Sequence, residues 1–401
     1  MTEFQPSKLG LISAILQSNV DKKSKPDEPA VELCNYTDVY YNDTITADLA
    51  FMKATASPDQ IERLRLSEGD VIITKDSETA DDIGIPAYVD STHDSLVCGY
   101  HLTILRAHPQ KAFPKFLYYS MLTRETGEYW EKRANGVTRV SIPQQVVSSL
   151  TIPLPNLETQ HRIADYLDKE ISEMDAMIEE FKELVRNLRA RKPMLIDNLL
   201  AGFPVAPLAL SWKVVDCLHI TAPFIDSGKN YLVSIEQLGS EDLILDGANR
   251  TDSGTFSNLR EGERKPSPGD VIMSRNASVG KSSIVKESDP PIALGQDVVI
   301  FKNNEKNDSR LLFYFLQSNA LKQTVDMNTV GSTLKRINVS SIKSLPYPVL
   351  ALEVQQSIAD RLRRETSKMD SLIEESTRLI ENLKARKTAL ITEVVTGRKE
   401  V

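Results

Sequence analysis

An internal repeat with a spacing of 195 residues constrains the fold of this chain more than any other feature of its sequence. Segment 157–202 aligns without a gap to segment 352–397, and 23 of the 46 aligned positions are identical. Identity at this level over such a length indicates an internal duplication, and the spacing is far longer than the repeat of a solenoid protein. The duplicated unit is therefore a domain together with the long segment that follows it.

Both aligned segments have the pattern of one long amphipathic helix. Apolar residues recur at alternating steps of four and three, which is typical of a helix with a coiled-coil seam. Asn156 can cap the first helix, and Gly202 and Gly397 mark the two ends. We expect Pro193 to interrupt the first helix, because proline lacks a backbone donor. Each helix would be about 60–70 Å long, too long for one domain to cover, so the two should pack on each other. The predicted seam residues are Ile171, Met174, Ile178, Phe181, Val185, Leu188, Met369, Ile373, Ile380 and Leu383.

The sequence ahead of each long segment alternates short β-like runs with turns and short helical stretches. GDVIITK at 69–75 has a counterpart in GDVIMSR at 269–275, whereas the sequences that follow these two runs diverge. One framework is thus repeated with two different surfaces. The chain is predicted to be α+β, with two tandem mixed α/β domains separated and followed by long helices. The predicted boundaries are 1–156 for the first domain, 157–202 for the central helix, 203–351 for the second domain and 352–401 for the C-terminal helix.

The composition limits the classes of function. The chain has 401 residues, of which 41% are hydrophobic and 26% charged, and its formal net charge is −8. A nucleic-acid-binding protein usually has a basic excess, so any contact with DNA must come from local basic loops or from a partner's surface. No run of eighteen or more apolar residues is present, so no contact with a membrane is expected. Three widely spaced cysteines argue against a disulfide framework and predict a cytoplasmic protein.

Motifs that would indicate catalysis are incomplete. DPPI at 289–292 resembles the Asp-Pro-Pro-aromatic motif of amino-methyltransferases, but Ile292 occupies the place of the aromatic ring that stacks on the base. ERK at 263–265 lacks the upstream acidic motif of a nuclease, and SVGKSS at 278–283 lacks the first glycine of a phosphate-binding loop. The five histidines are dispersed, and although His93, His101 and His108 share one region, no cysteine or carboxylate stands beside them at metal-ligand spacing. We therefore expect no catalytic site, no metal site and no cofactor on this chain.

Polar and basic loops are the remaining candidates for function. They follow the GDVIM run and surround Gly136 and Gly331. Their side chains are of the types that bind phosphates and base edges in DNA. For any single residue an ordinary solvated surface is an equally good interpretation, but the grouping favours DNA binding. The candidate DNA-binding residues are Lys132, Arg133, Thr138, Arg139, Arg275, Asn276, Ser278, Lys281, Thr333, Lys335 and Arg336.

This arrangement resembles the specificity subunit (HsdS) of type I restriction–modification systems. The resemblance rests on the GDVI run in each half, on the glycine loop that leads to a P-x-P or P-Y-P strand, and on L-E-x-Q-x-x-I-A-x-x-L at the start of each long helix. It extends over essentially the whole chain in the family's order. Where the family often has P-P-L-x-E-Q, this chain has PNLETQ and LALEVQ.

The resemblance implies a role without catalysis by the chain itself. In this family two target-recognition domains each read one half of a bipartite site in double-stranded DNA. The long helices pack as an antiparallel coiled coil, set the distance between the half-sites and dock two methyltransferase (modification) subunits. Those subunits bind S-adenosylmethionine, and restriction subunits, when they join the full complex, bring ATP-driven translocation and cleavage.

Two other classes of function stay open from the residues alone. A stand-alone DNA methyltransferase or nuclease would bind its cofactor without partners. A coiled-coil scaffold without DNA recognition would show no sequence preference when assembled.

Overall fold

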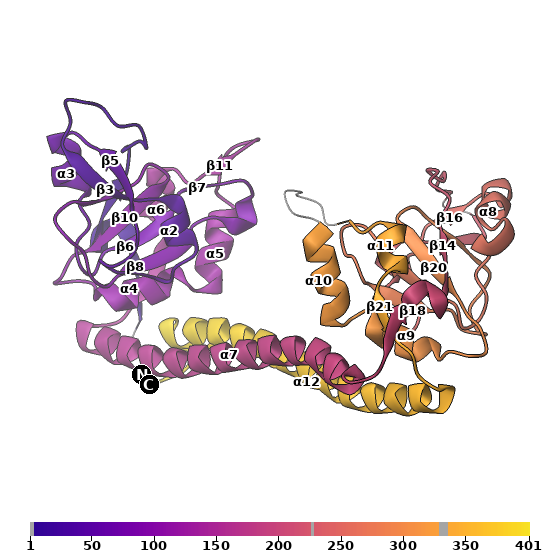
Figure 1. Ribbon diagram of the computed structural model, residues 1–401. Coiled ribbons are helices and arrows are strands. Elements are labelled where there is room, and N and C mark those ends of the chain that lie inside the picture. Colours follow the sequence, from indigo (N-terminus) through magenta and orange to yellow (C-terminus); the bar gives the residue numbers. More distant parts are fainter. Residues whose placement is uncertain (1–3, 226–227, 329–335) are drawn as a thin grey trace. The chain divides into compact units, whose positions relative to one another are not determined.

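The computed structural model describes residues 4–225, 228–328 and 336–401. The chain forms two compact units, which we call unit 1 and unit 2 (Figure 1). Unit 1 comprises Met1–Phe181 together with Arg378–Val401, and unit 2 comprises Lys182–Thr377. Each unit therefore contains one mixed α/β body, part of the first long helix and part of the second.

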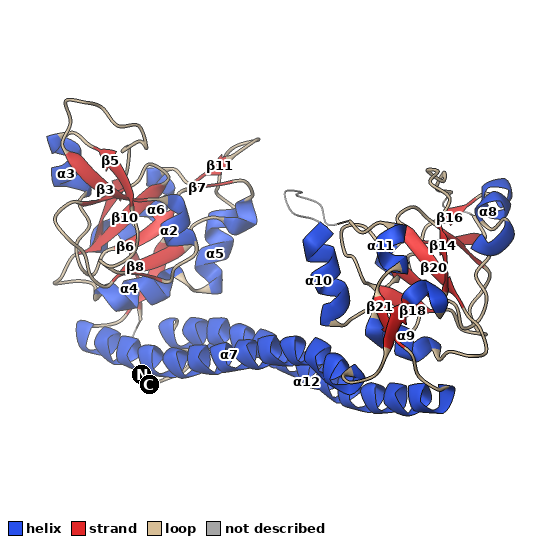
Figure 2. Cartoon of the chain, viewed as in Figure 1, coloured by secondary structure: helices blue, strands red, loops and turns tan. Residues whose placement is uncertain are grey.

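Unit 1 is built on a five-stranded sheet and a three-stranded sheet (Figure 2). Strand pairing is antiparallel except for β4 with β8 and β3 with β9. The five-stranded sheet has the order β2 (Ser13–Gln17), β10 (Leu102–Ala107), β6 (Val71–Thr74), β8 (Pro86–Val89) and β4 (Thr44–Ile45). The smaller sheet has the order β5 (Met52–Thr55), β3 (Ala30–Cys34) and β9 (Leu96–Cys98). Two short pairs join β1 (Gln5–Lys8) to β12 (Thr151–Leu154) and β7 (Asp76–Ser77) to β11 (Val140–Ser141).

Unit 2 repeats this plan with a four-stranded sheet and a three-stranded sheet. The larger sheet has the order β14 (Lys213–Asp216), β20 (Val298–Lys302), β17 (Val271–Ser274) and β18 (Ser282–Ile284). The smaller sheet has the order β16 (Arg250–Thr251), β15 (Asn230–Val233) and β19 (Ile292–Leu294), with β15 and β19 parallel. A short pair joins β13 (Val205–Pro207) to β21 (Pro346–Pro348).

Short helices cover these sheets. In unit 1 they are α1 (Leu9–Ile12), α2 (Tyr36–Tyr40), α3 (Pro58–Leu64), α4 (Pro114–Met121), α5 (Arg124–Glu131) and α6 (Gln144–Ser149). In unit 2 they are α8 (Ser253–Leu259), α9 (Ser309–Phe315), α10 (Asn319–Asn328) and α11 (Val339–Lys343). Single 3-10 turns lie at Ala80–Asp82, Leu208–Leu210, Ile235–Gln237 and Gly262–Arg264.

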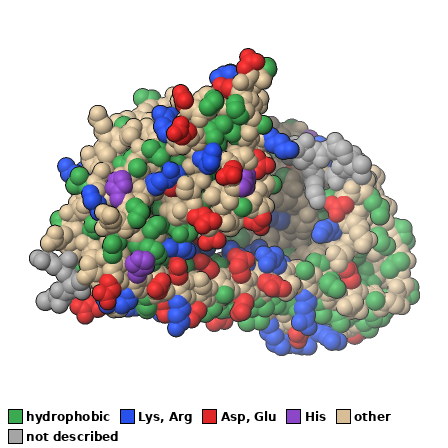
Figure 3. All heavy atoms as spheres, turned by 90° about the vertical axis from the view of Figure 1, so that its left-hand side faces the viewer, with side chains coloured by type: hydrophobic (Ala, Val, Ile, Leu, Met, Phe, Trp, Pro, Cys, Tyr) green, Lys and Arg blue, Asp and Glu red, His purple; other side chains and the backbone are tan. Residues whose placement is uncertain are grey.

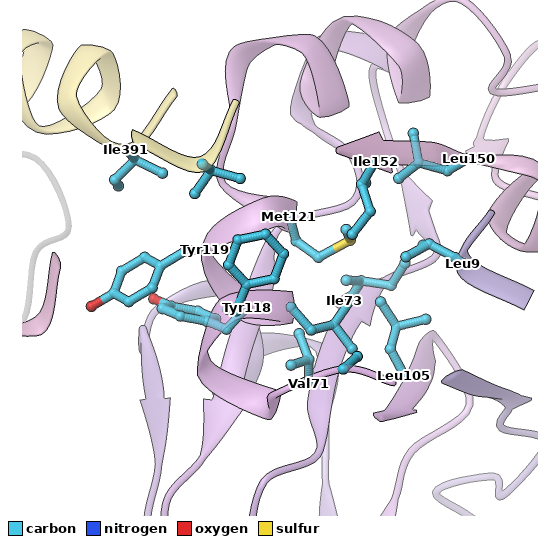
Figure 4. Packing of buried hydrophobic residues seen from close by; sticks show 14 of the residues in the cluster. Leu9, Val71, Ile73, Leu105, Tyr118, Tyr119, Met121, Leu150, Ile152 and Ile391 are labelled. Atoms are coloured by element: carbon cyan, nitrogen blue, oxygen red, sulfur yellow. The ribbon is translucent and has the colours of Figure 1, made fainter. Parts of the chain in front are cut away.

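The GDVI runs form strands that are buried on both faces. Side chains alternate across a strand, so Val71 and Ile73 of β6 pack in one core of unit 1 while Ile72 packs in another. Figure 4 shows Val71 and Ile73 in the first of these cores, together with Tyr119 and Met121 of α4. In unit 2, β17 divides its side chains between two cores in the same way. The continuous apolar run of each motif follows from this double burial.

The aspartate of each GDVI motif has a structural role. Asp70 is 1% exposed and accepts two hydrogen bonds of 2.7 Å from the Arg106 guanidinium and one of 2.8 Å from the Ser67 backbone N–H. Asp270, also 1% exposed, accepts bonds from the Lys302 ammonium and from the Ser267 and Asn303 backbone N–H groups. A buried carboxylate needs such partners, and the motif is therefore part of the framework of the fold.

The two long helices are α7 (Leu157–Leu200) and α12 (Leu352–Val395). In unit 1, Lys387 Nζ lies 2.8 Å from Asp175 Oδ2, and Lys399 Nζ donates to Tyr166 Oη over 2.8 Å. From Tyr166 to Asp175 the residue number increases along α7, whereas the partners run from Lys399 down to Lys387. The pairing of the two segments is therefore antiparallel. Ile391 of α12 joins the core that contains Tyr119 (Figure 4).

The same antiparallel pairing occurs in unit 2. Lys192 Nζ lies 2.7 Å from Asp370 Oδ1, and Ile196 packs in one cluster with Ala359 and Leu362. Both ion pairs are related by the 195-residue repeat, because Lys192 corresponds to Lys387 and Asp175 to Asp370. The predicted α+β fold with antiparallel coiled-coil helices is therefore confirmed.

The prediction that Pro193 interrupts the first helix is wrong, because α7 continues through it to Leu200. Proline removes one backbone hydrogen bond from a helix, and packing of the flanking turn can offset that loss. Here Ile196 is fully buried after the proline, and Leu195, Leu199 and Leu200 pack against the same core.

One buried glutamine near the start of each long helix forms hydrogen bonds with the α/β body of the same unit. Gln160 accepts a 2.8 Å hydrogen bond from the Phe113 backbone N–H and donates to the Lys111 and Pro155 carbonyls. Gln355, the repeat-related residue, accepts from the Asp308 backbone N–H over 3.0 Å and donates to the Leu350 carbonyl over 2.9 Å. These contacts explain the glutamine of the L-E-x-Q motif, since it satisfies backbone groups just before α4 and α9.

Candidate nucleic-acid interface

In unit 1 the candidate residues lie at and before a narrow loop. Asn135 and Ser141 exchange two backbone hydrogen bonds of 2.9 Å and close the loop at its base. Gly136 has φ +143°, and a Cβ there would lie 1.9 Å from the Arg139 carbonyl oxygen, so the turn requires glycine. Thr138 and Arg139 are exposed at the loop. Strands β7 and β11 lead to it at the edge of the body (Figure 1).

Lys132 and Arg133 are exposed just before this loop but are partly engaged. Lys132 Nζ lies 3.2 Å from a Glu128 carboxylate oxygen, and the Arg133 guanidinium lies 4.0 Å from the centre of the Tyr129 ring. Both contacts are at the surface, where ion pairs and cation–π contacts are weak enough to be exchanged for a phosphate.

In unit 2, Arg275 does not point to solvent. It is 4% exposed, its Nη2 lies 2.8 Å from His219 Nε2, and its Nε lies 3.5 Å from Asp216 Oδ1. A guanidinium enclosed in this way cannot reach a DNA base without unfolding its surroundings. Arg275 is therefore removed from the set of direct contacts and is assigned to positioning the loop that follows it.

Lys75 is the counterpart of Arg275 in unit 1, which sequence reasoning missed. The Lys75 carbonyl accepts from the Ile142 backbone N–H, as the Arg275 carbonyl accepts from that of Ile337. Lys75 Nζ donates to the Ser18 carbonyl over 3.0 Å and lies 4.6 Å from the centre of the Tyr100 ring. Burial lowers the pKa of Lys75 from its ordinary value. The available signal was its place directly after the GDVI strand, which Arg275 shares.

Asn276 and Arg336 are brought together beside Asp297. An isolated bridge pairs Asn276 with Arg336, and the Asn276 amide donates to Asp297 Oδ2 over 3.3 Å. Arg336 Nη2 lies 3.7 Å from Asp297 Oδ1 while the side chain stays exposed. Ala277 and Asp297 both have positive φ, at 55° and 63°, and such strained non-glycine residues concentrate at functional sites.

Two further candidates, Ser278 and Lys281, line a cavity of about 420 Å³ in unit 2. Lys281 is exposed, and Ser278 is half-buried. Thr333 and Lys335 lie outside the residues that the structure describes.

Within the described residues, Asp216, Cys217 and His219 bring three potential metal ligands within 4.8 Å of one another. The arrangement does not fit a cation, because the Arg275 guanidinium already contacts both Asp216 and His219. Burial raises the pKa of the Cys217 thiol, which disfavours the thiolate that a metal would need.

The predicted seam residues of the long helices differ in exposure. Phe181, Ile373, Ile380 and Leu383 are half-buried. The buried ones are Ile171, Met174, Ile178, Val185, Leu188 and Met369.

Charge on the molecular surface is mixed. On the face that Figure 3 presents, Lys and Arg side chains intermingle with Asp and Glu side chains. In the described part of the chain, no helix combines the length and the apolar character needed to cross a lipid bilayer.

Comparison with known protein families shows to which family this chain belongs. The model of the type I restriction modification DNA specificity domain matches residues 1–184 and 221–382, one copy for each half of the repeat. The chain belongs to this specificity-subunit family. Family members are non-catalytic, in agreement with the incomplete catalytic motifs, and the resemblance drawn from the sequence is confirmed.

Individual relatives of this family are similar over most of the chain. The MjaVIII specificity subunit of Methanocaldococcus jannaschii is 26% identical over 311 residues, which cover 71% of this chain and 70% of the relative. The putative MjaX specificity subunit of the same organism is 25% identical over 86% of this chain and 81% of its own length.

Solved structures share the fold. The HsdS subunit from Thermoanaerobacter tengcongensis aligns over 99% of this chain and 97% of its own, with a TM-score of 0.56 and 15% identity. A chain from a study of assembly and conformational transition of the type I restriction–modification system aligns over 100% of this chain and 99% of its own, with a TM-score of 0.75 and 17% identity.

Proposed function

We propose that this specificity subunit reads a bipartite site in double-stranded DNA, with one half-site read by the α/β body of each unit. The observation that carries this proposal is the selective duplication of the chain. Gln160 and Gln355, and the two Lys–Asp pairs between the long helices, are kept in both copies. The loops next to these frameworks differ in sequence. Two α/β bodies that share a framework but differ in their loops are suited to recognising two different DNA half-sites.

The DNA-contacting set that we propose contains the exposed and half-buried candidates of each unit. In unit 1 these are Lys132, Arg133, Thr138 and Arg139, and in unit 2 they are Asn276, Ser278, Lys281 and Arg336. Thr333 and Lys335 stay in the proposal on sequence grounds alone. Such side chains bind phosphates and base edges.

Two equivalent exposed positions on the long helices support docking of two methyltransferase subunits. Met177 of α7 is 41% exposed and Leu372 of α12 is 46% exposed, and the repeat relates the two. A large apolar side chain kept at the surface of both copies suits two equal partners. The methyltransferase subunits would supply S-adenosylmethionine, and restriction subunits would add ATP-driven cleavage.

Replacing Met177 by Asp is expected to remove one methyltransferase subunit from the complex, and M177D/L372D to remove both. An aspartate in an apolar contact would be desolvated without a partner and should weaken each association by about 2–5 kcal/mol. Native mass spectrometry of the co-expressed complex measures the stoichiometry. Glu183→Asp, at an exposed position of α7, is the matched control. Two methyltransferase subunits on the double variant would place the docking surface elsewhere.

Selection of duplexes from a random DNA library by the assembled complex tests the proposed function. We expect two enriched blocks separated by unspecified base pairs. A single block, or no enrichment, would favour the scaffold alternative. Calorimetry of the purified chain with S-adenosylmethionine tests the stand-alone methyltransferase, which requires binding without a partner.

A further inference from the structure

Unit 2 contains a cavity at a place that unit 1 fills with a tryptophan. In unit 1, Trp130 of α5 is 1% exposed and packs so closely on Gly84 that a Cβ there would lie 2.3 Å from the Trp130 ring. The repeat places Val325 of α10 at the position of Trp130. Gly280 corresponds to Gly84, because each donates its backbone N–H over 3.0 Å to the carbonyl of the last residue of the GDVI strand. Gly280 and Val325 both line a cavity of about 420 Å³.

Two buried serine residues that line this cavity have hydroxyl groups without a hydrogen-bond partner among the described residues. Ser282 is 2% exposed and Ser318 is 3% exposed, and both line the cavity. Neither Oγ atom has a partner among the described residues. A buried hydroxyl without a partner is unfavourable by about 1–3 kcal/mol, so such groups point to a bound ligand that satisfies them.

Unit 1 shows that these hydroxyls are not required by the fold. Thr123 corresponds to Ser318, and its hydroxyl is satisfied locally: it donates to the Ser120 carbonyl over 3.0 Å and caps α5 through the Thr126 backbone N–H. Pro86 lies at the place of Ser282, two residues after the equivalent glycine, and offers no hydroxyl. The unpartnered pair is therefore particular to the unit that has the cavity.

The charges around the cavity favour an anion. Lys281 and Lys322 line it, both are exposed, and neither forms an ion pair with any described residue. Asp326 is the acidic residue on the wall, so the fixed charge there is positive. Ser318 immediately precedes α10, a helix of ten residues whose N-terminus adds a positive electrostatic potential at the cavity.

We propose that this cavity binds one phosphate group of the DNA backbone, held by the Ser282 and Ser318 hydroxyls and by the Lys281 and Lys322 ammonium groups. That the phosphate comes from DNA rests on the proposed function. Ser278 and Lys281 line the cavity and also belong to the loop that we propose to contact DNA. No equivalent clamp is present among the described residues of unit 1. The two bodies therefore hold the duplex differently, with an extra phosphate contact in unit 2.

Two double variants separate the charge from the hydroxyls in the assembled complex. Lys281→Gln with Lys322→Gln should lower the slope of log K against log salt concentration by about one and weaken specific binding about tenfold. Ser282→Ala with Ser318→Ala keeps the charge, so the slope should stay constant while affinity falls about tenfold. Lys306→Gln, an exposed residue outside the cavity, is the matched control.

The outcomes distinguish this site from the proposed function. If the wild-type complex selects no DNA sequence, the proposed function fails. If it binds specifically and both double variants match Lys306→Gln in affinity and slope, the phosphate site is overturned alone. Calorimetry of the DNA-free complex with inorganic phosphate and with a nucleoside triphosphate tests whether the cavity binds a free phosphate compound instead of the DNA backbone. Tight binding that the double variants abolish, with DNA affinity unchanged, would overturn the assignment to DNA.

Discussion

Four residues inserted into both long helices at repeat-related points are expected to lengthen the spacer of the recognised DNA by one or two base pairs. The ion pairs fix the facing positions: Asp175 faces Lys387 and Lys192 faces Asp370. Insertions after Glu183 of α7 and after Arg378 of α12 lie at repeat-related points and lengthen both helices equally. Four residues add about 6 Å of helix, and base pairs rise about 3.4 Å each. An insertion of this length is a stutter, which coiled coils accommodate by local unwinding.

Both half-site sequences should be unchanged in this variant, because no recognition loop is altered. Methylation sequencing of a host that carries the variant and its methyltransferase measures the spacer and the half-sites together. The same insertion in α7 alone would move Lys192 one turn from Asp370, and we expect that control to assemble poorly. An unchanged spacer in a variant that still methylates would refute the role of the helices as a ruler.

Replacing Gln160 by Leu should destabilise unit 1, and Gln355→Leu should destabilise unit 2. Leucine has nearly the same volume but leaves the Phe113 or Asp308 backbone N–H and the neighbouring carbonyls without partners. Each buried group left unpaired is unfavourable by about 1–3 kcal/mol, so the loss should be about 3–5 kcal/mol. Hydrogen exchange should show lost protection at the start of α4 in one variant and of α9 in the other. Gln323→Leu, at an exposed position of α10, is the control, and equal protection in all three variants would contradict this role.

The long helices were predictable because one physical signal extends over their whole length. An apolar stripe repeated at steps of four and three needs a partner, and the chain supplies two of equal length. The continuation of α7 through Pro193 was not predictable from the local effect of proline. It depends on the burial of Ile196, which packs against residues far away in the sequence. Local penalties decide an element only where tertiary packing is weak.

The candidate site was predictable in its location but not in the orientation of its side chains. The sequence placed Arg275 and Lys281 in one loop, yet Arg275 turns inward to His219 and Asp216 while Lys281 faces the cavity. His219 is 56 residues from Arg275 in the sequence. Val325 lines the cavity and stands where Trp130 stands in the other copy, but the lining also comes from residues far apart in the sequence, which only the folded chain brings together.

We propose that this one chain specifies both halves of a split DNA site. Genome-wide sequencing of methylated bases tests it most directly, in a host free of other DNA methylation that expresses the chain with its methyltransferase. We expect one asymmetric motif with two specified blocks and an unspecified spacer of constant length, and no methylation when the chain is omitted. A continuous or palindromic motif, or the same methylation without the chain, would contradict it.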